Sequence, residues 1–115
     1  MSLTPMQVEK RLLDLSKEID EAHQDLIRCE HTYHSAKATY EIEMARSRMA
    51  VSHPDHKLTS AQREDMALIE NAKLHVDIAI AESSVKAARA NANRIRTQVD
   101  IARSISVSVR ASMEL

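Results

Sequence analysis

A seven-residue apolar repeat runs through both halves of the sequence and constrains the fold more than any other feature. In the first half, apolar residues alternate between spacings of four and three from Val8 to Tyr40. In the second half, a similar series runs from Leu74 to Met113, with Ser106 as its polar exception. We call these two series the heptad stripes. A repeat kept over four or more heptads is typical of coiled coils, because neither helix can bury its stripe alone in water.

The ends of the two helices are indicated by the distribution of glycine and proline. The chain has no glycine, which disfavours the tight turns that need a positive φ angle. The one proline away from the N-terminus, Pro54, would remove a hydrogen bond from any helix that contained it. We therefore predict a single domain over residues 1–115 with a helix over about 5–52, a loop over 53–59 and a second helix over about 60–113.

Both predicted helices begin with the same capping pattern. Thr4 precedes Pro5 and is followed three residues later by Gln7, and Thr59 is followed by Gln62 at the same spacing. In a capping box, the threonine side chain and the glutamine side chain each satisfy a backbone amide that the helix leaves unpaired. Proline suits the first helical position because its missing amide is not needed there.

The two stripes match each other if the chain folds back on itself at the predicted loop. With residue i of the first helix opposite about 114 − i of the second, large side chains mostly oppose small ones, as in the pair Leu26 and Ala88. The same register places Glu9 near Arg103 as a flanking ion pair. The predicted fold class is therefore all-α: a long antiparallel two-helix hairpin that forms a coiled coil.

Near the loop the heptad stripes lapse, because the polar residues Glu43, Ser47 and Asn71 stand where apolar ones are expected. A second apolar stripe appears on the opposite side of each helix. A two-helix hairpin would leave this stripe in water, so we predict dimerisation into a four-helix bundle. The predicted self-association residues are Ile42, Met49, Ile69, Val76 and Ile80.

Positive charge is concentrated at the end of the chain. Residues 1–85 carry ten basic and fifteen acidic side chains, whereas residues 86–115 carry six basic and two acidic ones. Arg89, Arg96, Arg103 and Arg110 recur every seventh residue beside the stripe. They suit ion pairing with the first helix and coverage of its core, or contact with the phosphates of a nucleic acid. Both interpretations stay open at this level.

No pattern of residues indicates catalysis or a bound cofactor. Cys29 is the only cysteine, so no internal disulfide forms, and the spacing of His31 and His34 is not that of a zinc module. Glycine-rich loops are absent, and a thin coiled coil offers no pocket for a small-molecule substrate. We expect no enzyme activity, no cofactor and no metal. Neither a signal peptide nor a membrane span is indicated, so we expect a cytoplasmic protein.

Several segments resemble small phage-encoded coiled-coil proteins of unknown function from early gene regions near recombination and replication genes. These segments are residues 33–41 (Tyr-His-Ser-Ala-Lys-Ala-Thr-Tyr-Glu), 45–48, 57–64 and the arginine-rich 94–104. The resemblance implies a location in the host cytoplasm and a role in DNA metabolism or in modulating a host protein.

These observations favour a non-enzymatic interaction protein that binds a partner protein through a helical face. One alternative is an accessory DNA-binding protein of phage recombination or replication that uses the four arginines. Another is an inhibitor of a host nucleic-acid enzyme that uses the acidic first helix.

Overall fold

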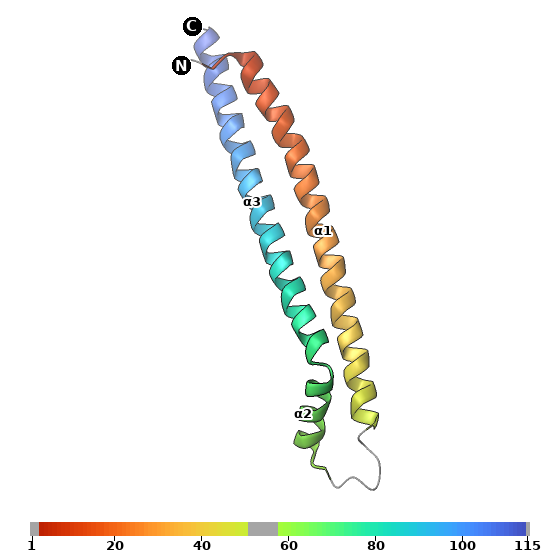
Figure 1. The fold of residues 1–115 in the computed structure, drawn as a ribbon. Coiled ribbons are helices and arrows are strands. Elements are labelled where there is room, and N and C mark those ends of the chain that lie inside the picture. The colour runs from red at the N-terminus through yellow and green to blue at the C-terminus, as the bar shows by residue number, and fades with distance from the viewer. Residues whose placement is uncertain (1–2, 51–57, 115) are drawn as a thin grey trace. The chain divides into compact units, whose positions relative to one another are not determined.

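The structure of the chain is a computed structural model that describes residues 3–50 and 58–114. Within those residues, all regular secondary structure is helical and forms α1 (Pro5–Ala50), α2 (Ser60–Glu70) and α3 (Ala72–Glu114) (Figure 1). The all-α fold class is thereby confirmed. Residues 51–57, which include most of the predicted loop, lie outside the described residues, and residues 58 and 59 are not helical.

Both predicted capping boxes are present. At the start of α1, the Thr4 amide donates to Oε1 of Gln7 at 2.9 Å, and the Gln7 amide donates to Oγ1 of Thr4 at 3.2 Å. At the start of α2, the Thr59 amide donates to Oε1 of Gln62 at 2.9 Å, and the Gln62 amide donates to Oγ1 of Thr59 at 3.1 Å. The two helix starts are therefore set by short-range hydrogen bonds that the sequence pattern predicts.

The single second helix predicted over 60–113 is wrong, because the helix is interrupted at Asn71. Its backbone angles are φ −107° and ψ 22°, and it caps the C-terminus of α2. The side-chain amide of Asn71 donates to the carbonyl of Ala67 at 2.9 Å. Asparagine competes in this way with regular helical bonding, since its short side chain reaches nearby backbone groups. The same amide also donates to Oγ of Ser47 in α1 at 2.9 Å.

The contacts group the chain into two compact units, which we describe separately. The first unit comprises Met1–Ile27 and Lys86–Leu115, and the second unit comprises Arg28–Val85. α1 and α3 each contribute to both units, whereas α2 belongs to the second unit alone.

The core of the first unit is made by the heptad stripes. Leu15 is completely buried, and Arg11 with Gln98 and His23 with Arg96 form contacts beside this core, so the two segments run antiparallel within the unit. The stripe ends at Val109, because Met113 is 68% exposed. The residues that make up the core cluster are Leu12, Leu15, Ile19, Ala22, Ala92, Ile95, Val99 and Ala102.

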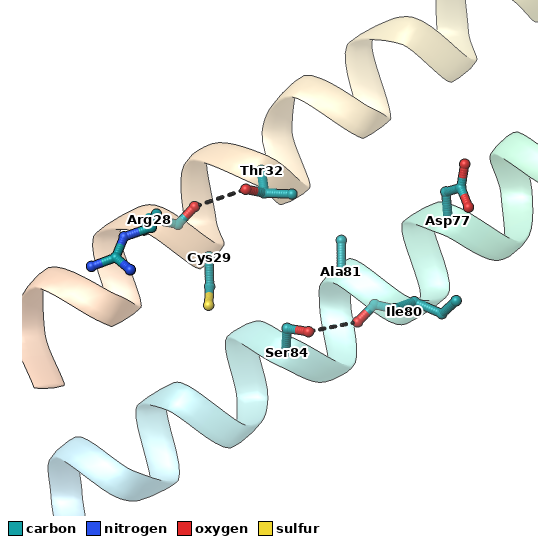
Figure 2. A pocket seen from close by; sticks show the side chains of 7 residues that line it. All are labelled: Arg28, Cys29, Thr32, Asp77, Ile80, Ala81 and Ser84. Atoms are coloured by element: carbon teal, nitrogen blue, oxygen red, sulfur yellow. Dashed lines mark hydrogen bonds between the residues drawn. The ribbon is translucent and has the colours of Figure 1, made fainter.

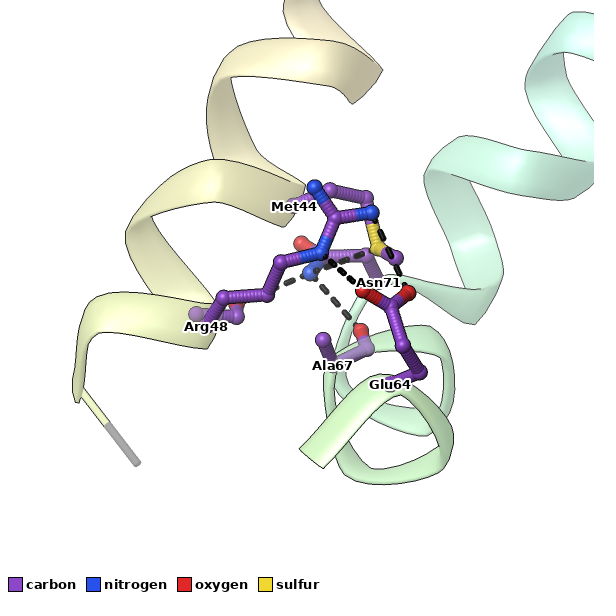
Figure 3. A network of polar contacts seen from close by, with 6 residues as sticks. Met44, Arg48, Glu64, Ala67 and Asn71 are labelled. Carbon is purple, nitrogen blue, oxygen red and sulfur yellow. Dashed lines mark hydrogen bonds and ion pairs between the residues drawn. The ribbon is translucent and has the colours of Figure 1, made fainter. Parts of the chain in front are cut away.

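In the second unit the stripe continues through the polar residues near the predicted loop, contrary to the expected lapse. Ser47 and Asn71 are each 7% exposed and hydrogen-bond to each other, so each polar group is satisfied inside the core. Met44, which the stripe did not include, is also buried, and its sulfur lies 3.7 Å from the Asn71 amide (Figure 3). At the edge of this network, Arg48 and Glu64 form an ion pair at 2.6 Å.

Candidate functional site

The second unit carries exposed apolar side chains at all five predicted self-association positions. These side chains are between 53% and 79% exposed, although each is large enough to contribute substantially to a core. Ile42 and Met49 are seven residues apart on α1, and Val76 and Ile80 are four apart on α3, so each pair lies along one side of its helix; exposed apolar residues arranged in this way are a candidate interaction surface. We call this set the apolar face: Ile42, Met49, Ile69, Val76 and Ile80.

A groove of about 330 Å³ lies next to the apolar face in the second unit. Ile80 belongs to both the groove and the apolar face. Figure 2 shows Cys29 and Ala81 pointing toward each other from α1 and α3 across the space between the two helices. The residues that line the groove are Arg28, Cys29 and Thr32 from α1 and Asp77, Ile80, Ala81 and Ser84 from α3.

The groove exists because small side chains meet there from both helices. Cys29, Thr32, Ala81 and Ser84 are all too short to fill the space between α1 and α3. The Thr32 hydroxyl donates to the carbonyl of Arg28 at 3.0 Å, and the Ser84 hydroxyl donates to the carbonyl of Ile80 at 3.1 Å. Because both hydroxyls bond to their own helix, the groove presents mainly carbon and sulfur atoms to an incoming group.

The four predicted nucleic-acid residues, Arg89, Arg96, Arg103 and Arg110, are all exposed and all belong to the first unit. The Arg96 guanidinium lies 3.2 Å from Nε2 of His23, a contact that joins the two segments of the unit. The four side chains thus follow one edge of the first unit at intervals of seven residues.

The predicted ion pair between Glu9 and Arg103 is not formed. Glu9 instead borders a small depression that is also lined by Val8, Val109 and Arg110, so the nearest of the four arginines in this depression is the one a heptad further along α3.

The remaining candidate chemistry is sparse. His31 and His34 are exposed, and the ring of His34 lies 5.3 Å from that of Tyr33. Among residues 3–50 and 58–114, no three histidine, cysteine or carboxylate side chains gather closely enough to hold a metal ion. The histidines at 53 and 56 lie outside the described residues. Within residues 3–50 and 58–114, no helix has the length and apolar character needed to cross a membrane.

Comparisons of the chain with protein-family models, with curated proteins and with solved structures found no match. The resemblance to phage-encoded coiled-coil proteins therefore stays a prediction.

The sequence pattern placed the five residues of the apolar face outside the stripe, where the structure exposes them, but it did not indicate the groove. The groove is hard to recognise in the sequence. It forms where short residues of α1 face short residues of α3, and which residues face each other can be predicted only if the register of the two helices is known. Charged residues also flank it, Arg28 on α1 and Asp77 on α3, although neither stood out in the sequence.

Proposed function

We propose that the chain is a non-enzymatic coiled-coil protein, an antiparallel two-helix hairpin that associates with itself through the apolar face to form a four-helix bundle. The assembled protein then binds a partner protein through another helical face. The observation that carries this proposal is the exposure of five large apolar side chains within one unit.

The energetics favour association. Full burial of such a side chain stabilises by about 1.5–3 kcal/mol, so burial of the exposed two thirds contributes roughly 1–2 kcal/mol. Ten of these side chains in a two-fold dimer therefore contribute about 10–20 kcal/mol, against an association cost of about 4–15 kcal/mol. A two-fold axis is the simplest arrangement, because it pairs the same surface of each copy.

A separate surface of the first unit suits a partner protein. Met6, Leu13 and Ile27 are 78%, 65% and 65% exposed, and their spacings of seven and fourteen residues place them along one side of α1. An amphipathic helix of another protein recognises such a row by packing its own apolar side chains between these residues.

The first test is the oligomeric state of the protein and of a double variant, Val76→Glu with Ile80→Glu. We expect the unaltered protein to sediment as a dimer at tens of micromolar and the variant to sediment as a monomer that remains helical by circular dichroism. Two buried carboxylates per copy would be strongly unfavourable in the interface.

The matched control is Ala90→Glu with Ala111→Glu, which adds the same charge at two exposed alanines of α3 that belong to the first unit. This control should remain dimeric. An unaltered protein that is monomeric, or a dimer that both double variants leave intact, would contradict the proposed interface.

The four arginines Arg89, Arg96, Arg103 and Arg110 support a second candidate function, binding of nucleic acid, since all four residues are exposed on the first unit. Each phosphate contact that is lost should reduce the slope of log K against log salt by about 0.9 on duplex DNA. We expect Arg96→Ala with Arg103→Ala to remove two phosphate contacts. The magnitude of the slope should then fall by about 1.8, as measured by fluorescence anisotropy titrations at several salt concentrations. Arg94→Ala, which removes an arginine outside the edge, is the control; equal effects of the two variants would exclude the edge as the binding surface.

A further inference from the structure

We propose that α2 is a flap that opens about Asn71 while α1 and α3 of the second unit stay folded. In the structure the flap is closed, and two polar contacts with α1 hold it in that position. Opening moves Ile69, which belongs to the apolar face, so the state of the flap decides whether that face is complete. The inference goes beyond the proposed self-association, because it rests on contacts within one copy of the chain.

α2 contributes very little apolar burial of its own. Ala67 is its one buried residue, Arg63 is half-buried, and all the other residues from Ser60 to Glu70 are exposed. An isolated helix of 11 residues is marginal in water, because most of the stability of such a helix comes from packing of an apolar face. The large apolar side chains that α2 leaves exposed are Met66, Leu68 and Ile69.

The first polar contact is made by a single amide group. The side-chain amide of Asn71 donates to Oγ of Ser47 in α1 and to the carbonyl of Ala67 in α2, each at 2.9 Å. This amide therefore joins the last turn of α2 to α1, and α2 cannot move away from α1 without breaking one of the two bonds. Both Asn71 and Ser47 are buried, so water has to enter to satisfy the group that loses its partner.

The second polar contact is the ion pair between Arg48 of α1 and Glu64 of α2 (Figure 3). Nε of Arg48 lies 2.6 Å from Oε1 of Glu64, and the Arg48 guanidinium also donates to Oε2 at 3.1 Å. The two side chains are 47% and 51% exposed. Water and salt therefore compete for both charges, and an exposed pair of this kind contributes little to stability. We call the two polar contacts the latch.

Asn71 has the geometry of a hinge. Its φ of −107° and ψ of 22° interrupt the helix between Glu70 and Ala72. The carbonyl of Asn71 accepts from the amide of His75 at 3.1 Å, so the first turn of α3 has a hydrogen bond that does not involve α2. Residues at the ends of elements commonly absorb the change in backbone angles when one element moves relative to another. We therefore place the hinge at Asn71.

Amide hydrogen exchange of the full chain tests the flap, with mass spectrometry as the readout and one fixed protein concentration throughout. We expect the amides of α2 to exchange at least about tenfold faster than those of residues 29–40 in α1 and 75–85 in α3, because a flap opens without unfolding of its neighbours. Exchange of α2 at the same rate as these two segments would mean that the unit opens as a whole, and it would overturn the proposal.

Two substitutions test the latch. Ser47→Ala removes an acceptor of the Asn71 amide, and Glu64→Gln removes one charge of the ion pair. We expect exchange in α2 to become about fivefold faster with Ser47→Ala and about threefold faster with Glu64→Gln, while exchange in residues 29–40 and 75–85 does not change. Because Glu64 is at the surface, Glu64→Gln tests the latch even if circular dichroism shows that Ser47→Ala unfolds the protein.

Ser84→Ala and Glu43→Gln are the matched controls. The Ser84 hydroxyl donates to the carbonyl of Ile80 in its own helix at 3.1 Å, and Glu43 pairs with Arg46 of its own helix at 2.9 Å. Neither bond holds α2, so neither change should alter exchange in α2. Latch variants that leave exchange in α2 unchanged, or that speed exchange equally in all three segments, would overturn the proposal.

Discussion

Leu15→Ala removes the one large side chain that is completely buried in the first unit. The side chain packs in a cluster built from α1 and α3, with Ala92 and Ile95 among its members. Loss of three carbon atoms costs roughly 2.4 kcal/mol of transfer free energy, at about 0.8 kcal/mol for each buried methylene group. The vacated space adds a cavity cost, and measured values for buried leucines range from about 2 to 5 kcal/mol. Since the cluster has only two helices and can partly collapse, we expect a loss of about 3 kcal/mol.

Leu13→Ala is the matched control for this prediction. Leu13 is two residues away on the same helix and 65% exposed, so the change in helix propensity is the same while little burial is lost. We expect it to cost less than about 1 kcal/mol. Urea unfolding followed by circular dichroism at a fixed protein concentration measures both values, because association adds to the apparent stability. Equal losses for the two variants would refute the assignment of Leu15 to the core.

Three further predictions concern the stripe, the core hydrogen bonds and the caps. Leu26→Asp should unfold the protein, because it places a carboxylate in the stripe, whereas Gln24→Asp on the exposed side should cost within about 0.5 kcal/mol by thermal melting. A double-mutant cycle of Ser47→Ala and Asn71→Ala should show a coupling energy of about 0.5–1.5 kcal/mol, and additive losses would mean that their hydrogen bond contributes nothing. Thr59→Ala should cost about 1 kcal/mol through loss of the capping box and should speed amide exchange in the first turn of α2, while unchanged exchange there would contradict the capping role.

Much of the candidate site follows from periodicity alone. The five residues of the apolar face were expected to lie outside the stripe, and the structure places them at the surface. A helix repeats every 3.6 residues, so the side on which a residue lies can be predicted once a stripe has been recognised. The groove could not be predicted in the same way, because it depends on Cys29 and Thr32 meeting Ala81 and Ser84 from a distant part of the chain.

Two of the failed expectations lie at positions where a polar residue interrupts the repeat. Ser47 and Asn71 were interpreted as a lapse of the stripe, yet both are buried and bonded to each other. A polar residue in a stripe is unfavourable only if it lacks a partner. Ser47 lies on α1, whereas Asn71 follows α2, so each residue finds its hydrogen-bond partner in a distant part of the chain. The effect of either residue on stability therefore cannot be predicted from its own segment.

By itself, the sequence determines the features of this protein that depend on neighbours in the chain. The all-α class, the two capping boxes and the positions that form the core of the first unit follow from helical periodicity and from hydrogen bonds spanning three residues. Tertiary structure alone decides the burial of Ser47 against Asn71 and the groove beside Ile80. Each of these depends on two segments more than twenty residues apart meeting at close range, where one side chain supplies the hydrogen bond or the volume that the other lacks.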